Sequence, residues 1–452
     1  MHDSDLNRRE LLKLAALATG GMVSLHPDAF GKNQDTSAKG SGSQDGEGRG
    51  KAKSVVSPHP PPEMATLYSK EYGRRRIQKI QAAVRQVNLD ALIVSNRGLD
   101  YIGYVSNFHP YPLEPGMALV LADGPSTLFV NTYSSAHTRA LIPIVWTDEL
   151  VDIPRDPVSE GSNQNLVNAC IQRLQDRKLQ RGRIGLAGDE IDWLLPFYLR
   201  DRLPDVKAED ANRTLTQVIV VKDEVELALI RSAQRIIDEV AYPSFRKELR
   251  PGAMDQAVYA RVLASMLERG ASPATVLLFD ACPAGSGTWA SGTRGRRLEK
   301  GDIVLSEPTP SIAGYQSEKM YTFALGREIP ESQKRGSQVI FEAYQLLMGE
   351  LKVGQELTPI VQKVEAFIRS HGYDGSTVPV GHWIGTQNHE GPRFTVEGTR
   401  GWVLQKDMVM SWHPNIVVPG KVRTTCSTCV LLTEKGAEDL SSIKMEPIYY
   451  VE

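Results

Sequence analysis

The chain has 452 residues, of which 41% are hydrophobic and 23% are charged, so it is long enough to bury two or three separate cores. Its 52 Lys and Arg and 54 Asp and Glu residues are mixed along the chain and give a formal net charge of -2. This charge pattern lacks the basic surface that a phosphate backbone requires, and we expect no nucleic-acid partner.

The N-terminus has the pattern of an export signal. Two adjacent arginines, Arg8 and Arg9, precede a modest apolar run at residues 14–25. This run is too short and too rich in Gly and Thr to span a bilayer, so we expect no stable membrane span. Residues 1–31 resemble a twin-arginine signal, which predicts a periplasmic or secreted protein. The alternative is a basic, amphipathic first helix of a cytosolic protein.

The next segment predicts a linker followed by a first domain. Gly, Ser, Lys and Asp dominate residues 32–53 and prolines cluster at 58–62, so residues 32–63 are expected to be a disordered linker. Ile77, Ile80 and Val84 then recur at helical spacing and predict a helix that ends near Asn88.

Short β-prone runs follow that helix and complete the first domain. They are bounded by Gly, Asp or Pro and lie at residues 91–95, 117–122, 127–130 and 184–187. Buried strands that alternate with helices are typical of an α/β layer. Residues 64–221 therefore predict one α/β domain.

The second domain, residues 222–452, mixes helices with hairpin-like strands. Apolar stripes predict helices at residues 223–247, 255–269 and 331–351. Strand patterns lie at residues 303–307, 314–325, 408–412 and 424–432. This mixture is typical of an α+β domain.

Five segments of the second domain carry a family resemblance. They are residues 301–307, 314–323, 381–390, 408–416 and 422–433, and their order and spacing resemble the creatinase, aminopeptidase P and prolidase family, peptidase M24. The resemblance implies a creatinase-like N-terminal α/β domain followed by an α+β pita-bread domain. It also implies hydrolase activity and a homodimer.

The resemblance further implies a metal site, and this sequence departs from it. As the resemblance implies, peptidases of the family have a two-metal site. In it two aspartates, one histidine and two glutamates hold ions about 3.5 Å apart. The matching positions here are Glu307, Glu318, His382, His413 and Thr425. Because bridging carboxylates offset the repulsion between two close ions, their loss argues against a dinuclear site. Glu307, Glu318, His382 and His413 could hold one Zn, Fe or Mn ion, or none.

Alternatives without a metal stay open at these positions. His382 and His413 could be ordinary buried histidines that hydrogen-bond Glu307 or Glu318. Creatinase, as the resemblance implies, has the fold without a metal and uses a histidine as base. The sequence has no histidine between His137 and His371, so the family's histidine ahead of the first ligand strand is missing.

The remaining site predictions concern catalysis and substrate binding. His389 is the first candidate for the general base, and His382 and Glu318 are the other candidate catalytic residues. Candidate substrate contacts are Trp383, Arg393 and Tyr315; tryptophan at such a position is more often part of a core. The expected substrate is a small polar amide, amidine or guanidine, which the pocket chemistry favours, or a short Xaa-Pro peptide. A lyase with an altered site and a non-catalytic binding module are the alternatives.

The C-x-x-C pair Cys426 and Cys429 lies in a predicted strand. Residues three apart on a strand point to opposite faces, so we expect two separate buried thiols rather than a disulfide or a metal site. A bulge in this strand would reverse that expectation.

Overall fold

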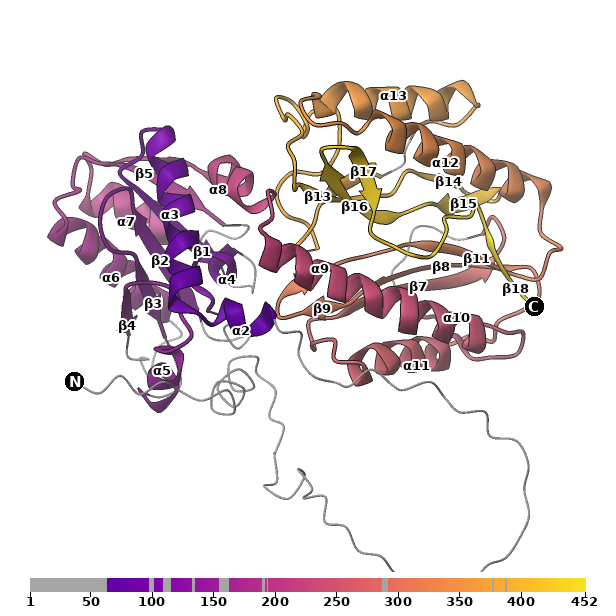
Figure 1. Ribbon diagram of the computed structural model, residues 1–452, viewed down its shortest axis with the longest axis horizontal. Helices are drawn as coiled ribbons and strands as arrows, with labels where there is room; N and C mark the ends of the chain where they lie inside the picture. The colour runs from indigo at the N-terminus through magenta and orange to yellow at the C-terminus, as the bar shows by residue number, and fades with distance from the viewer. Residues whose placement is uncertain are drawn as a thin grey trace, which may run out of the picture.

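The computed structural model describes residues 63–96, 101–108, 115–131, 135–153, 162–188, 192, 194–286, 292–375, 378–386 and 388–452. Figure 1 shows two domains side by side, the N-terminal one on the left and the C-terminal one on the right. The predicted signal at 1–31 and nearly all of the predicted linker at 32–63 lie outside the described residues. The first helix begins at Glu63, the last residue assigned to that linker.

The N-terminal domain is built on one six-stranded mixed sheet with the strand order β4-β3-β2-β1-β5-β6. Pairs β1–β2 and β2–β3 are antiparallel, whereas β1–β5, β3–β4 and β5–β6 are parallel. The strands are β1 (Ala91–Asn96), β2 (Gly116–Leu121), β3 (Thr127–Val130), β4 (Glu149–Asp152), β5 (Arg183–Ala187) and β6 (Lys207–Asp210).

Helices cover both faces of this sheet, as expected for an α/β domain. They are α2 (Glu63–Leu67), α3 (Lys70–Gln86), α4 (Tyr101–Ser106), α5 (Ser135–Leu141), α6 (Ser162–Asp176), α7 (Leu194–Arg202) and α8 (Asn212–Ile219). Alternate residues of a strand point to opposite faces. Accordingly Leu92 and Val94 of β1 pack with residues of α3, α4 and α8, while Ala91 and Ile93 pack with residues of α6 and α7.

The C-terminal domain contains two four-stranded sheets and two short ribbons. One sheet has the order β18-β11-β8-β7 and the other β12-β13-β16-β17; the ribbons are β9–β10 and β14–β15. The strands are β7 (Val276–Pro283), β8 (Asp302–Thr309), β9 (Ser311–Ile312), β10 (Tyr315–Gln316), β11 (Tyr321–Leu325), β12 (Gly381–Trp383), β13 (Val409–Trp412), β14 (Asn415–Val418), β15 (Val422–Thr425), β16 (Thr428–Thr433), β17 (Gly436–Asp439) and β18 (Tyr449–Val451).

Helices flank these sheets on two sides, so the sheets lie between helical layers (Figure 1). The lower layer holds α9 (Glu224–Ile236), α10 (Tyr242–Glu248) and α11 (Asp255–Glu268), and the upper layer holds α12 (Glu331–Glu350) and α13 (Leu357–Ser370). Each layer has its own apolar cluster. This is the α+β arrangement expected from the sequence.

The elements with strong apolar patterns agree with their predictions. The four predicted strands of the first domain correspond to β1, β2, β3 and β5. The long helix predicted at residues 223–247 corresponds to α9 and α10, with a π-helical turn at Ile237–Ala241 between them. The strands predicted at 314–325 and 424–432 are each interrupted, so each forms two shorter strands.

A buried arginine joins the two domains. Arg76 of α3 places its Nη2 atom 3.2 Å from Asp223 Oδ2 and 3.2 Å from Glu226 Oε1 at the start of α9. Its guanidinium carbon lies 4.1 Å from the ring centroid of Tyr104. Arg76 is 3% exposed and Glu226 is fully buried. Since a buried charge requires a close counter-charge, this contact fixes the N-terminal domain against α9.

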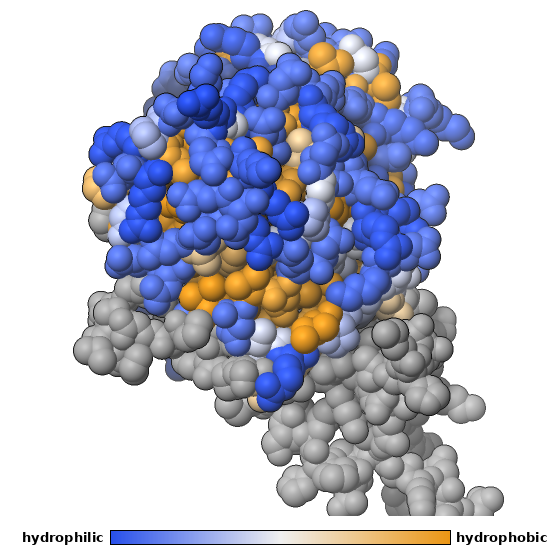
Figure 2. Space-filling view, turned by 90° about the vertical axis from the view of Figure 1, so that its left-hand side faces the viewer, coloured by the Kyte–Doolittle hydropathy of each residue, from blue (hydrophilic) through white to orange (hydrophobic). Residues whose placement is uncertain are grey.

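The outer face of the N-terminal domain is mostly hydrophilic, with an apolar area in the lower part of the view (Figure 2). None of the helices in the described ranges has the length and apolar character needed to cross a bilayer.

Candidate active site

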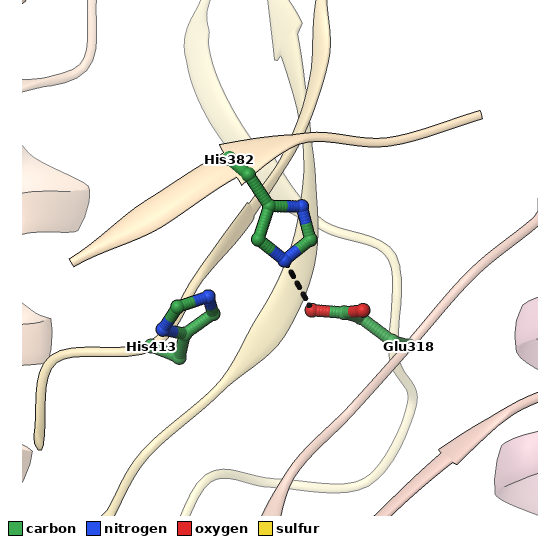
Figure 3. A group of neighbouring side chains, drawn as sticks. All are labelled: Glu318, His382 and His413. Atoms are coloured by element: carbon green, nitrogen blue, oxygen red, sulfur yellow. Dashed lines mark ion pairs between the residues drawn. The ribbon is translucent and has the colours of Figure 1, made fainter. Parts of the chain in front are cut away.

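Three side chains from distant parts of the chain meet between the two sheets of the C-terminal domain. Glu318 lies in the segment between β10 and β11, His382 lies on β12, and His413 directly follows β13. Figure 3 shows the two imidazoles and the carboxylate pointing toward one another. The sequence therefore correctly predicted that these three residues converge.

The geometry of this group suits a metal ion. Among the residues that the structure describes, Glu318, His382 and His413 offer ligand atoms that all lie within 4.8 Å of one another. His382 Nε2 lies 3.2 Å from Glu318 Oε1, the contact marked in Figure 3. The other ring nitrogen of His382 is 3.0 Å from the Trp383 carbonyl oxygen. A ligand histidine is usually oriented through its second nitrogen in this way.

Two buried polar atoms of the group have no hydrogen-bond partner in the described part of the chain. They are Glu318 Oε2 and His413 Nδ1. Buried polar atoms are normally paired, because leaving one unpaired costs about 1–3 kcal/mol. Both atoms are potential metal ligands, so the residues present fit a divalent ion.

Burial determines the protonation of the carboxyl groups. Desolvation raises the pKa of Glu318 to about 7, although a hydrogen bond from the Ser411 hydroxyl and the nearby Arg393 act in the opposite direction. Desolvation and then the charge of Glu318 raise the pKa of Glu307 well above its ordinary value. Glu307 of β8 thus lies near Glu318 as predicted. It does not belong to the compact group of possible ligands.

The three histidines of the site are close together and neutral. Ring centroids are 4.0 Å apart for His382 and His389 and 5.0 Å apart for His382 and His413. Desolvation lowers the pKa to about 3 for His382, about 2 for His389 and about 3 for His413. A neutral imidazole is the form that binds a metal ion or accepts a proton. His389 is only partly buried, whereas His382 and His413 are buried, so His389 is the more accessible of the three.

Arg393 brings a positive charge to the same place. Desolvation lowers the pKa of its guanidinium, and the nearby carboxyl groups of Glu318 and Glu307 act in the opposite direction. Arg393 is an exposed residue. It can therefore reach a ligand from the solvent side, consistent with the prediction that it contacts substrate.

Thr425 is the residue that the sequence predicts at the position of the resembling family's last glutamate. Its hydroxyl donates a hydrogen bond to the Pro414 carbonyl oxygen at 3.2 Å, and its backbone N–H donates to Thr322 Oγ1 at 3.1 Å. The residue is 1% exposed. A threonine bound in this manner supplies no anion for a second metal ion.

Two predicted substrate contacts are not part of this cluster. Trp383 is fully buried, and its ring packs against Phe394 and Trp402 at centroid distances of 4.8 and 5.3 Å. Because neighbouring residues of β12 point to opposite faces, Trp383 faces the core when His382 faces the site. The expected role of Trp383 in substrate binding is therefore corrected to a core role.

Tyr315 lies at the domain junction. Its hydroxyl donates to Glu226 Oε1 at 3.3 Å and accepts a hydrogen bond from Arg76 Nη2 at 3.5 Å. Its side chain thus belongs to the buried contact between the domains and lies outside the Glu318, His382 and His413 group. A substrate contact by Tyr315 stays a prediction.

The sequence analysis missed two contributions to the site. Ser411, whose hydroxyl binds Glu318, lies two residues before His413. The alternation of a strand could have indicated it. The second is a buried ion pair between Lys222 and Glu390, the residue that follows His389. Glu390 also accepts hydrogen bonds from the backbone N–H and the hydroxyl of Thr386, at 2.7 and 3.1 Å, which fixes the loop that carries His389.

The cysteine pair is distributed between two cores. Cys426 packs in the apolar cluster of the upper helical layer and Cys429 in that of the lower layer, and both thiols are free. The break between β15 and β16 falls at residues 426–427 and leaves the two side chains on different sides.

Comparison with known proteins agrees with this geometry. The model of metallopeptidase family M24 matches residues 228–451, and that of the creatinase/prolidase N-terminal domain matches residues 76–218. The chain belongs to metallopeptidase family M24. The chain is similar to relatives over nearly their full length. The Xaa-Pro dipeptidase of Pyrococcus furiosus is 26% identical over 389 residues, covering 82% of this chain and 99% of that protein.

Other relatives match about half of the chain or most of it. A methionine aminopeptidase of Clostridium acetobutylicum is 26% identical over 49% of this chain and 91% of its own length. Among solved structures, dipeptidase PepE of Mycobacterium ulcerans has a TM-score of 0.71 at 20% identity, covering 85% of this chain and 99% of that one. The prolidase of Pyrococcus horikoshii has a TM-score of 0.67 at 19% identity, covering 83% and 100%. These structures confirm the pita-bread fold of this M24 member.

Proposed function

We propose that this M24 protein hydrolyses the C–N bond of a short peptide of the Xaa-Pro type that has a free carboxylate. The observation that carries the proposal is the convergence of Glu318, His382 and His413 beside His389 and Arg393. The relatives that align over nearly their full length include an Xaa-Pro dipeptidase.

Arg393 supports one of the two substrate classes expected from the sequence. An exposed guanidinium binds a carboxylate through two parallel hydrogen bonds, whereas it repels a guanidine or amidine cation. Arg393 is the exposed cation that Glu307 and Glu318 both influence. A dipeptide carboxylate therefore suits this position better than the creatinase-like substrates.

The other residues have distinct roles in the proposed reaction. Glu318, His382 and His413 would hold a divalent ion, which polarises a scissile carbonyl and lowers the pKa of a bound water. His389, neutral and partly buried, lies beside this group, where its ring nitrogens would hydrogen-bond the substrate. Glu390 and Lys222 keep the His389 loop in place.

The test compares Xaa-Pro dipeptides with the same dipeptides amidated at the C-terminus. We expect the full chain to hydrolyse the free acids and to lose most of this activity on amidation. Arg393→Met should raise KM for the free acid with little effect on the amide, and Glu318→Gln should abolish hydrolysis. His371→Ala, which changes a histidine at the end of α13, is the control.

Other outcomes would redirect the proposal. Turnover of amidines or guanidines in place of dipeptides would support the creatinase-like alternative. Elimination products would indicate a lyase, and binding without turnover would indicate a non-catalytic module. Any of these results contradicts the dipeptidase proposal.

Export and oligomeric state are separate proposals. We propose that residues 1–31 direct the chain to the periplasm or out of the cell by the twin-arginine pathway, on the basis of Arg8 and Arg9. Replacing both with lysine should keep the protein in the cytoplasm, as measured by cell fractionation. A homodimer, proposed by analogy with the family, would appear as twice the chain mass in light scattering.

A further inference from the structure

We infer that the site is a mononuclear centre in which Glu318, His382 and His413 bind one zinc-class ion. This inference rests on the proposed function for the place of the ion, and it adds the number of ions and their chemical class.

The ligand set determines the class of metal. Among the described residues, two imidazoles and one carboxylate form the only group of possible ligands that meets within 4.8 Å. A set of two histidines and one glutamate is found in hydrolytic zinc enzymes, and two histidines with a carboxylate also bind ferrous iron. Manganese prefers sites that are rich in carboxylate and water oxygens. Replacement of oxygen ligands by imidazole should therefore favour zinc over manganese.

The charges of the site determine the number of ions. The site contains two carboxyl groups, Glu307 and Glu318, and the guanidinium of Arg393 that both of them influence. Even if both carboxyl groups lost their protons when a metal bound, these three groups would sum to -1, so one divalent ion would bring the total to +1 and two would bring it to +3. Two ions so close together would repel each other strongly in a buried site.

The second half of the family's site lacks free ligands. The Thr425 hydroxyl is already bound to the Pro414 carbonyl oxygen. Glu307 faces the charge of Arg393 and lies outside the compact ligand group. The unpaired buried atoms Glu318 Oε2 and His413 Nδ1, by contrast, belong to the three proposed ligands. The structure thus provides one set of available donor atoms.

The experiment measures metal binding without substrate. The full chain, without a histidine tag and purified without chelator, is analysed by elemental mass spectrometry. It is then titrated with Zn²⁺ and Mn²⁺ in competition with a chromogenic chelator. We expect one equivalent of metal per chain and at least about 10-fold tighter binding of zinc than of manganese.

Substitutions test whether the proposed ligands bind the metal. His413→Ala and Glu318→Gln should each weaken zinc binding by at least about 100-fold, since loss of an outer partner alone costs roughly 10- to 100-fold. His371→Ala is the matched control and should leave binding unchanged. The double change His413→Glu with Thr425→Glu should restore two carboxylates and shift the protein toward two ions and toward manganese.

Specific results would overturn the inference. Two equivalents of metal in the unaltered chain, manganese binding as tight as zinc, or zinc binding that survives His413→Ala would each contradict it. These results are independent of the proposed reaction. One bound zinc without dipeptide hydrolysis would retain this inference and reject the proposed function, and hydrolysis by a two-ion form would do the reverse.

Discussion

The buried ion pair behind the His389 loop gives a sharp test of the energetics of the site. Lys222 and Glu390 are 0% and 1% exposed at their side chains, so water does not screen their interaction. The Lys222 ammonium also donates to the Ile219 carbonyl oxygen at 2.7 Å. We therefore consider the change Lys222→Met, which keeps most of the unbranched side chain and removes its charge.

The expected cost follows from what the substitution leaves behind. Removing one partner of a buried ion pair costs roughly 3–5 kcal/mol, because the other charge remains without compensation. Glu390 would keep its two hydrogen bonds from Thr386, so we expect the lower end of this range, about 3 kcal/mol. The double change Lys222→Met with Glu390→Gln removes both charges. It should cost less than the sum of the single changes, with a coupling energy of about 2 kcal/mol.

The measurement is urea unfolding of the full chain, followed by far-UV circular dichroism and tryptophan fluorescence. The matched control is Lys363→Met, because Lys363 pairs with Glu350 at 2.7 Å with side chains that are 52% and 35% exposed. An exposed pair contributes about 0–1 kcal/mol. If Lys222→Met destabilises the protein no more than Lys363→Met, or if the two single costs simply add, the argument from burial is wrong.

Three further predictions concern local features. Asp223→Ala removes the N-cap of α9, whose carboxylate accepts two backbone hydrogen bonds, and also one of the two carboxylates that pair with Arg76. It should lower the free energy of unfolding by at least about 2 kcal/mol in the same urea assay. Gly385→Ala places a methyl group 2.6 Å from the charged atoms of the Lys222–Glu390 pair and should cost about 1–3 kcal/mol in that assay, whereas an unchanged stability would contradict the packing. Burial raises the pKa of the thiols of Cys170, Cys426 and Cys429 to about 12, so iodoacetamide at pH 8 should modify these residues only after unfolding, as read by peptide mass spectrometry.

The sequence predicted the core of the fold because burial leaves a periodic pattern. Strands β1, β2, β3 and β5 are continuous apolar runs, and all lie inside the sheet. The edge strands β4 and β6 were missed. All four residues of β6 are exposed and three of them, Lys207, Glu209 and Asp210, are charged, so the pattern that marks a buried strand is lacking there.

The site was predicted in part, for a related reason. Glu318, His382 and His413 could be placed because each lies in a segment whose order along the chain matches the family. The roles of Trp383 and Tyr315 depend on which side of a strand or of a domain junction each side chain occupies. Contacts between distant segments determine on which side each side chain lies. The hydrogen bond from Arg76 to the Tyr315 hydroxyl is one such contact. The Lys222–Glu390 pair joins residues 168 positions apart, and neither residue signals its partner locally.

The arginine between the domains has a consequence for the chain as a whole. Arg76 is supplied by one half of the protein, whereas the carboxylates that it binds, Asp223 and Glu226, belong to the other. A truncated gene that encodes residues 222–452 alone would remove the guanidinium that binds Glu226 and would uncover the Tyr315 ring beside it. We therefore expect the C-terminal half of this chain to be less stable without the N-terminal half.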